Sequence, residues 1–150
     1  MSRTATYHTR VTWKGEHWGH IQMGNGPEME FSAPPDAHGH AGVLTPEDAF
    51  VAAVNTCVMM MFIWSVERFK LDLVSYDCEA EGTKLIELDR TEIFTSVALR
   101  PRILLRARDE ERSAIEKRTR RALESALKYS LVANSIKSEI RVDPMIEIVK

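Results

Sequence analysis

The sequence predicts an α+β fold, and three features lead to this prediction. Short runs of β-branched and aromatic residues lie near both ends of the chain and after its middle. A long apolar segment, residues 45–69, has the pattern of a helix, and a second, amphipathic helix is expected to begin at Asp109. The resulting order is strands, helix, strands, helix and strands, which is typical of an α+β protein. With 150 residues, the chain is expected to form one domain with a real core, spanning residues 1–150.

The long apolar segment reads TPEDAFVAAVNTCVMMMFIWSVERF. Thr45 is a good N-cap, and Glu47 in the first turn puts negative charge where the helix dipole favours it. Among the sixteen residues 49–64 only Asn55 and Thr56 are polar, and a helix apolar on every side is a buried helix or a membrane span. Sixteen residues are few for a span and acidic residues crowd one end, so we expect a long buried central helix.

Short apolar runs separated by turn residues predict the strands. The expected strands are residues 3–13, 16–23, 28–31, 71–81, 92–105, 139–142 and 145–149. Gly82 marks a turn, and Pro101 is expected to bend its strand or to place it at a sheet edge. Residues 32–44 form a loop of thirteen residues, a length that usually belongs to a functional or mobile segment.

The second helix is expected from Asp109 to Lys128, because its apolar residues recur mostly at intervals of three, four or seven. These residues are Ile115, Ala122, Leu123, Ala126 and Leu127. Ser130 is expected to cap a short further helix.

The balance of charges excludes some classes of partner. The chain has 20 Lys and Arg against 22 Asp and Glu, which argues against nucleic acid or an anionic membrane as a main partner. The first ten residues contain no apolar run typical of a signal peptide. Two cysteines are too few for a disulfide scaffold, so we expect a reduced protein of the cytoplasm.

Two segments resemble the signatures of a known family. The segment TPEDAFVAAVNTC, residues 45–57, is similar to the N-P-E-E-L-…-A-A-…-C signature of the OsmC/Ohr family, the osmotically inducible and organic hydroperoxide resistance proteins. The segment ALKYSLVANSIKSEIRV, residues 126–142, is similar to its second signature, A-…-K-x-C-P-[VI]-S-N-[ST]-[IL]-…-V. The resemblance covers essentially the whole chain. It implies antiparallel sheets around the central helix, an intertwined homodimer with packed central helices and, in active members, peroxiredoxin-like reduction of organic hydroperoxides by a cysteine pair.

The resemblance also assigns roles to single residues. Cys57 matches the cysteine that attacks the peroxide, and Glu47 matches the glutamate after the signature proline. Ser130 occupies the position of the resolving cysteine, which this chain therefore lacks. The activating arginine of the family lies in the N-terminal hairpin or in the loop before the helix, but residues 14–44 contain no arginine.

For the cysteines, a structural and a chemical interpretation both stay open. A thiol in an apolar helix is often a plain core residue, and it reacts with peroxide only as a thiolate. If Cys57 turns over, an external thiol must recycle it, because a serine at position 130 cannot form a disulfide. Cys78 is the one internal alternative, but Asp77 and Glu79 beside it do not favour a thiolate, so a strand role is expected.

The histidines and the apolar side chains of the helix allow further alternatives. One or two of the loop histidines could replace the missing arginine, or His38 and His40 could join Cys57 in a metal site; otherwise they are solvated loop residues. We expect neither a metal nor another cofactor. The residues Met59, Met60, Met61, Phe62 and Trp64 either line a pocket for an apolar ligand or form core.

Three functions follow as hypotheses. The first is a thiol protein that reduces organic hydroperoxides through Cys57, recycled by an external thiol. The second is a catalytically inactive homodimer that binds a small molecule, and the third is a metal-binding variant.

Since Glu47 lies ten residues before Cys57, about 15 Å along one helix, it can serve the Cys57 site only from a partner chain. Antiparallel helices would then cross near Ala52 and Ala53.

Overall fold

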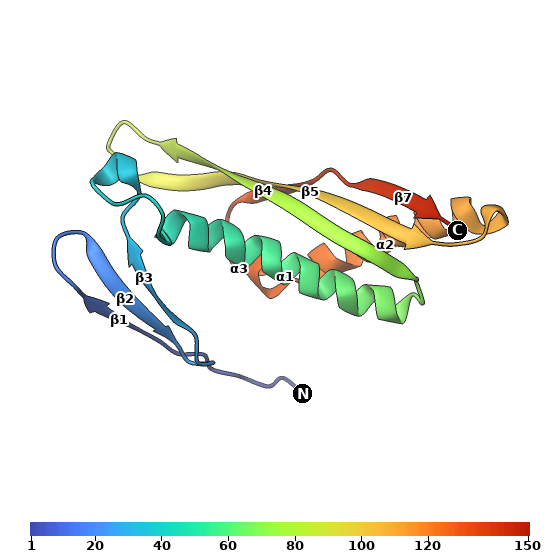
Figure 1. Cartoon of the computed structure of the whole chain (residues 1–150), viewed down its shortest axis with the longest axis horizontal. Helices are drawn as coiled ribbons and strands as arrows, with labels where there is room; N and C mark the ends of the chain where they lie inside the picture. The colour runs from blue at the N-terminus through green and yellow to red at the C-terminus, as the bar shows by residue number, and fades with distance from the viewer. The chain divides into compact units, whose positions relative to one another are not determined.

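The computed structural model describes all residues, 1–150, and the α+β prediction is confirmed (Figure 1). In chain order the elements are β1 Thr9–Trp13, β2 Trp18–Met23, β3 Glu28–Ser32, η1 Pro35–Ala37, α1 Pro46–Arg68, β4 Leu73–Ile86, β5 Glu92–Arg106, η2 Asp109–Glu111, α2 Arg112–Tyr129, α3 Leu131–Ser135, β6 Glu139–Val142 and β7 Met145–Val149. The chain forms two compact units, residues 1–50 and residues 51–150, which are described separately below.

The first unit is a three-stranded antiparallel sheet in the order β1-β2-β3. The strand predicted from residue 3 begins only at Thr9, because Thr9 pairs with Met23 and β2 ends there, so earlier residues have no partner strand. Gly19 lies opposite Phe31, and a Cβ at this position would come within 2.4 Å of the Phe31 ring. Glycine here therefore lets the aromatic ring cover the neighbouring strand.

The loop at residues 32–44 is ordered by its own contacts. The buried Ser32 hydroxyl donates to the carbonyl of Ala33 at 2.7 Å and accepts the backbone N–H of His40 at 3.1 Å. Backbone pairing of Phe31 with Leu44 closes the loop at its base. Hydrogen bonds from the Ser32 side chain and from the two ends of the loop therefore satisfy part of its backbone and hold it in place.

The second unit contains a sheet built on β5, which pairs antiparallel with β4 and parallel with both β6 and β7. The expectation that both sheets are antiparallel is therefore wrong for this sheet, because β6 and β7 run parallel to β5. The prediction of a sheet edge at Pro101 is wrong, because β5 is the central strand and Pro101 is buried in it, while the alternative of a bend stays a prediction. Leu99 pairs with β6 and Arg102 with β7, so Pro101 falls between the two parallel partners and neither of them pairs with it. A central proline is tolerated here because no parallel partner pairs with it.

The predicted turn at Gly82 is also wrong. Gly82 lies inside β4, opposite Val97, and the strand continues to Ile86. A Cβ at Gly82 would come within 2.6 Å of Val51 on α1 and 2.9 Å of Phe94. Glycine at this position therefore serves the close approach of a helix to the sheet and not a change of chain direction.

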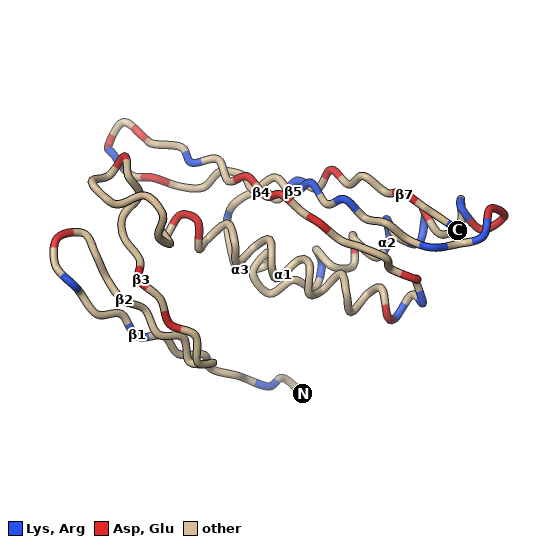
Figure 2. Tube along the Cα trace, in the orientation of Figure 1, with Lys and Arg blue, Asp and Glu red and all other residues tan.

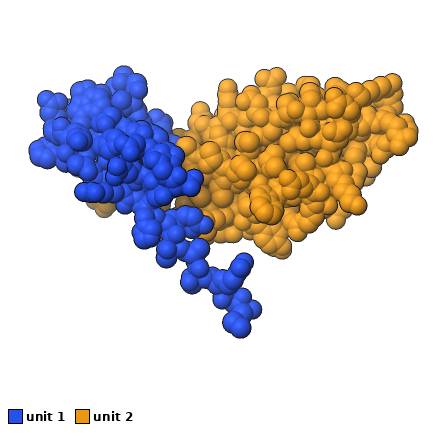
Figure 3. Space-filling model, turned by 60° about the horizontal axis from the view of Figure 1, so that its bottom comes forward, with its two compact units in different colours: residues 1–50 blue, residues 51–150 orange.

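One face of this sheet carries the core. Alternate residues of β5 are buried, and helices α1 and α2 cover them from the same side (Figure 1). The buried apolar side chains of the chain are Val54, Val58, Phe62, Val66, Leu71, Val97, Leu99, Ile103, Leu105, Ile115, Ala122, Leu123 and Ala126. The opposite face is solvated, with acidic positions on β4 beside basic positions on β5 (Figure 2), including an Arg100–Glu81 ion pair at 3.4 Å. All of the buried apolar residues belong to the unit drawn in orange in Figure 3.

Both ends of α1 are capped. At the start, the Thr45 hydroxyl accepts the backbone N–H of Asp48 at 3.1 Å, which confirms the predicted N-cap. At the end, Lys70 adopts a positive φ of 55°, and Leu71 N–H bonds to the carbonyl of Val66 at 3.0 Å. This is a Schellman arrangement, which satisfies the carbonyls that the last turn leaves open.

Within the single chain α1 is buried on one face only, and burial of its other face by a partner helix stays a prediction. The sheet and the other helices of its unit cover one face, which carries Val54, Val58 and Phe62. On the opposite face Met60 is 51% exposed and Trp64 is 68% exposed. One chain therefore leaves an apolar helix face in contact with solvent.

The C-terminal elements agree with the sequence prediction. The second helix begins with the short turn η2 at Asp109 and continues as α2, whose predicted apolar face is largely buried. The Arg118 guanidinium donates to the carbonyl of Phe69 at 3.1 Å, so α2 is tied to the end of α1. Strands β6 and β7 have the predicted bounds.

Candidate functional site

Cys57 lies in the middle of α1 and is half-buried, at the border between the covered and the open face of the helix. The Ser130 hydroxyl donates a hydrogen bond to Cys57 Sγ at 3.1 Å. The two residues are 73 positions apart in the chain, and only the return of the chain after α2 brings them together. The two matched signature positions thus meet in the folded chain.

Ser130 is fully buried and is held by the backbone around it. It lies between α2 and α3, where its N–H bonds to the carbonyl of Leu127 and its carbonyl accepts the N–H of Asn134. Its side-chain oxygen accepts the N–H of Ala133 at 3.3 Å, which confirms the predicted cap of α3. Because this N–H occupies a lone pair of the oxygen, the hydroxyl proton is free to point toward Cys57.

The second cysteine faces a different environment. Asn55 on α1 donates to the carbonyl of Cys78 on β4 at 3.1 Å, so this side of α1 faces the sheet. Residues two positions apart on a helix point in nearly opposite directions, which turns Cys57 away from β4 and toward α3. Burial raises the pKa of the Cys78 thiol, and Asp77 and Glu79 raise it further. Cys78 is therefore a poor nucleophile, and both cysteines are free thiols.

Glu47 lies in the first turn of α1, ten residues before Cys57. One of its carboxylate oxygens, Oε1, is buried and has no hydrogen-bond partner within the chain. An α-helix rises 1.5 Å per residue, so about 15 Å separates the two positions along the axis and the single helix does not bring them together. A buried oxygen without a partner costs free energy, so this oxygen is a ready acceptor for a donor such as water.

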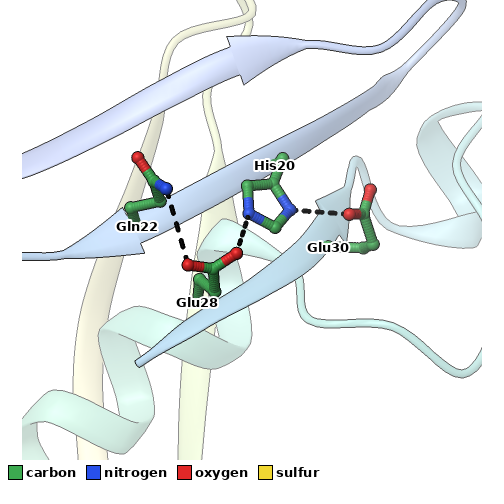
Figure 4. Close-up of polar contacts among 4 residues, drawn as sticks. All are labelled: His20, Gln22, Glu28 and Glu30. Atoms are coloured by element: carbon green, nitrogen blue, oxygen red, sulfur yellow. Dashed lines mark hydrogen bonds and ion pairs between the residues drawn. The ribbon is translucent and has the colours of Figure 1, made fainter. Parts of the chain in front are cut away.

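The contacts of the histidine side chains lie within the first unit. His20 on β2 hydrogen-bonds through Nδ1 to Glu30 at 2.6 Å and through Nε2 to Glu28 at 3.2 Å, both on β3 (Figure 4). The hydrogen bond to Glu30, helped by Glu28, raises the pKa of His20, against the opposing effect of desolvation. The result is a charged cluster on the surface of the N-terminal sheet, to which Gln22 also donates, at 3.5 Å from Glu28.

The loop histidines make ring contacts. His40 stacks on Trp18 with ring centroids 4.1 Å apart, and His38 lies 6.1 Å from His17. No group of three or more His, Cys, Asp or Glu side chains in residues 1–150 has an arrangement that could hold a metal ion. The hypothesis of a metal site at His38 and His40 therefore gains no support from the geometry.

Some of the apolar side chains near Cys57 are buried in the core, and others are exposed to solvent. Phe62 belongs to the core and contacts the ring of Tyr76 at a centroid distance of 5.3 Å. Met59, Met60 and Trp64 are exposed, so they are not core residues of the single chain. The contact of Asn55 with β4 does not follow from the sequence, because a lone asparagine in an apolar helix carries no signal for its partner.

Both signature segments also lie within the match to a known protein family. A sequence model described as OsmC-like protein matches residues 39–144, which include both signature segments up to position 142. The chain belongs to the OsmC-like protein family. The family resemblance of the sequence is thereby confirmed. No curated protein matches the chain.

Solved structures show the same fold. An OsmC-like protein of unknown function from Vibrio cholerae is 22% identical with a TM-score of 0.79, covering 95% of this chain and 100% of its own. An organic hydroperoxide resistance protein OsmC from Legionella pneumophila is 14% identical with a TM-score of 0.68, covering 97% and 99%. An organic hydroperoxide resistance protein from Elizabethkingia anophelis is 17% identical with a TM-score of 0.69, covering 98% and 99%.

The length and composition of α1 would also suit a membrane span. The most apolar window of 18 residues in α1 has a mean hydropathy of 1.9, and 28% of that window is buried. One helix of this kind is weak evidence for a span, because the core helix of a soluble protein passes the same test of length and composition.

Proposed function

We propose that this OsmC-like protein reduces organic hydroperoxides through Cys57 and is recycled by an external thiol. The observation that carries the proposal is the Ser130 hydroxyl 3.1 Å from Cys57 Sγ, because it places a proton donor at the one thiol that faces away from the sheet. Names of solved structures with this fold, organic hydroperoxide resistance proteins among them, agree with this substrate class. The balanced charge and the reduced cysteines suit action in the cytoplasm without nucleic acid or membrane partners.

The proposed reaction has two stages. The Cys57 thiolate attacks one peroxide oxygen, the O–O bond breaks, and the alkoxide leaves and takes up a proton to become an alcohol. Cys57 is then a sulfenic acid. One external thiol attacks its sulfur, releases water and forms a mixed disulfide; a second thiol attacks that disulfide, restoring Cys57 and leaving the external thiol oxidised as its own disulfide.

The reductant is external because the chain offers no second thiol at this site. Ser130 cannot form a disulfide, and Cys78 lies on the strand that Asn55 faces, on the other side of α1. Under sustained peroxide without a reductant, Cys57 is expected to proceed to sulfinic acid, which is irreversible without a dedicated repair enzyme.

A homodimer is part of this proposal. The exposed apolar face of α1 includes Ala52, Met60 and Trp64, and a second α1 would remove it from water. The small residue at position 52 would let two helices approach closely, halfway between Glu47 and Cys57. In an antiparallel pair, the buried, unpartnered Oε1 of Glu47 would then lie near the Cys57 site of the partner subunit.

Mass spectrometry after one equivalent of cumene hydroperoxide tests the proposed reaction. We expect one oxygen atom added at Cys57 within seconds, removed again by excess dithiothreitol, and no change at Cys78. Cys57→Ser should take up no oxygen, and Cys78→Ser should behave like the parent protein. A Cys57 thiol that stays unmodified at a hundredfold excess of peroxide would contradict the proposal.

That contrary outcome would favour the second candidate, an inactive dimer that binds a small apolar molecule. The absence of a resolving thiol at Ser130 and of arginine in residues 14–44 favours it. It predicts saturable binding of an apolar dye with no oxidation of Cys57, and the same binding in Cys57→Ser.

A further inference from the structure

We propose that Ser130 is a catalytic residue, whose hydroxyl stabilises the thiolate form of Cys57 in addition to capping α3. The inference rests on the proposed function in that Cys57 is taken as the reacting group. It goes beyond that function because it assigns the activating contact to Ser130 of the same chain. The family resemblance alone implies only that a resolving cysteine is missing at this position.

The geometry fixes the direction of the hydroxyl. Ser130 is fully buried, and two backbone hydrogen bonds, to Leu127 and from Asn134, hold its main chain. The Ala133 N–H reaches the side-chain oxygen at 3.3 Å and takes an acceptor position. The single hydroxyl proton is therefore directed to its remaining neighbour, Cys57 Sγ, at 3.1 Å.

The contact favours the ionised sulfur. A hydroxyl bonds more strongly to a negative acceptor than to a neutral one, so the O–H···S contact strengthens when Cys57 loses its proton. Cys57 lies in the middle of α1, where the helix termini are several turns away and supply little field. Ser130 is the one side chain that hydrogen-bonds this sulfur. The attacking form of the thiol thus has a defined source of stabilisation.

The same contact shapes the step after oxidation. A serine next to the sulfur can donate to it but cannot condense with a sulfenic acid to give a disulfide. The oxidised Cys57 therefore stays available to an external thiol. In this site, activation and recycling are separated, with Ser130 serving the first and a diffusing thiol serving the second.

The pH profile of Cys57 alkylation tests the inference without any peroxide. Rates with monobromobimane are measured from pH 5 to pH 10 in a Cys78→Ser background, so that a single thiol reports. Ser130→Ala should move the midpoint upward by about one pH unit, which is a tenfold smaller thiolate fraction below the midpoint. Ser130→Gly should give the same shift while weakening the α3 cap only slightly, so it serves if the alanine variant fails to fold.

Two further variants separate the donor from packing. Ser130→Thr keeps a hydroxyl and should keep the parent midpoint. Ser135→Ala removes an exposed hydroxyl of α3 that bonds to Leu131 and should have no effect. An unchanged midpoint in folded Ser130→Ala or Ser130→Gly would overturn the inference, as would a shift of equal size in Ser130→Thr or Ser135→Ala.

The outcome is distinguishable from failure of the proposed function. If alkylation depends on Ser130 but peroxide leaves Cys57 unmodified, the thiolate contact stands and the peroxidase proposal fails. If peroxide oxidises Cys57 at the same rate and with the same alkylation midpoint in the parent protein and in Ser130→Ala, the peroxidase proposal stands and the role of Ser130 is refuted.

Discussion

The two compact units of the chain differ in what holds them together. All thirteen buried apolar residues and both cysteines lie in residues 51–150, whereas all five histidines lie in residues 1–50. The second unit therefore has its own core and carries the candidate thiol site. The first unit depends on strand pairing and on polar contacts such as the cluster around His20.

The difference has a physical consequence. A small sheet without a buried apolar face is marginal in water, because little apolar surface leaves solvent when it forms. In the first unit Trp13 is 75% exposed and Val11 is 62% exposed. We therefore expect the second unit to set the free energy of unfolding of the chain. The stability of the first unit should depend more on solution conditions such as pH.

The largest effect is expected at α1, the helix that runs from the first unit into the second. Ala53→Arg places a charge at the proposed crossing of two α1 helices, where it would have no partner. We expect a monomer or an unfolded protein, measured by size-exclusion chromatography with light scattering. Glu124→Arg, on the exposed surface of α2, is the control and should remain a dimer. A folded dimer of Ala53→Arg would exclude this crossing.

The contrast between the units is tested directly by one substitution in each. Phe62→Ala removes a fully buried ring of the second unit and should lower the free energy of unfolding by about 3–5 kcal/mol. Met29→Ala, at a 40% exposed position of the first unit, should cost less than about 1 kcal/mol. Urea unfolding at one fixed protein concentration measures both. An equal decrease in the free energy of unfolding for both variants would mean that apolar packing stabilises the first unit as much as the second.

A second cysteine at position 130 tests how close the side chains of residues 57 and 130 lie in the second unit. Ser130→Cys places a sulfur where an oxygen now lies 3.1 Å from Cys57 Sγ, so a disulfide of about 2.05 Å is within reach of a small movement. We expect the introduced thiol to form a disulfide with Cys57 after mild oxidation, seen by non-reducing peptide mapping. Ser135→Cys, on the exposed side of α3, should form none. Absence of the disulfide in Ser130→Cys would show that the Cα geometry does not suit a bridge.

The smallest effect is expected in the first unit and depends on pH. The hydrogen bond to Glu30, with a smaller contribution from Glu28, raises the pKa of His20, so the folded sheet favours the charged imidazole. The resulting stabilisation is fully present below the ordinary pKa of 6.5 and is lost as pH rises through the raised folded value. It therefore favours the N-terminal sheet at pH 6 over pH 9.

His20→Gln should remove this dependence. Hydrogen exchange of the β2 and β3 amides, compared with the parent protein at the same pH, should be faster in the variant at pH 6 and nearly equal at pH 9. His8→Gln changes an exposed histidine that has no side-chain partner and serves as the control. A difference between parent and His20→Gln that is the same at both pH values would assign the effect to packing and not to charge.

Much of the fold follows from short-range rules that the sequence displays. Thr45 and the acidic residues after it start α1, the interval of apolar residues sets α2, and Ser130 starts α3. The two signatures identify the family and point to Cys57, Glu47 and Ser130. These features are local, because capping, periodicity and motif spacing involve residues within a few turns of one another.

Only the tertiary structure decided which face of each element is covered and which distant residues meet. Gly82 looks like a turn residue until Val51 packs against it, and Pro101 looks like an edge residue until it falls between two parallel partners. An all-apolar α1 carries no signal for the face that stays open. The contact between Ser130 and Cys57 joins positions 73 apart, and its existence depends on the path of the whole chain between them, which no local preference determines.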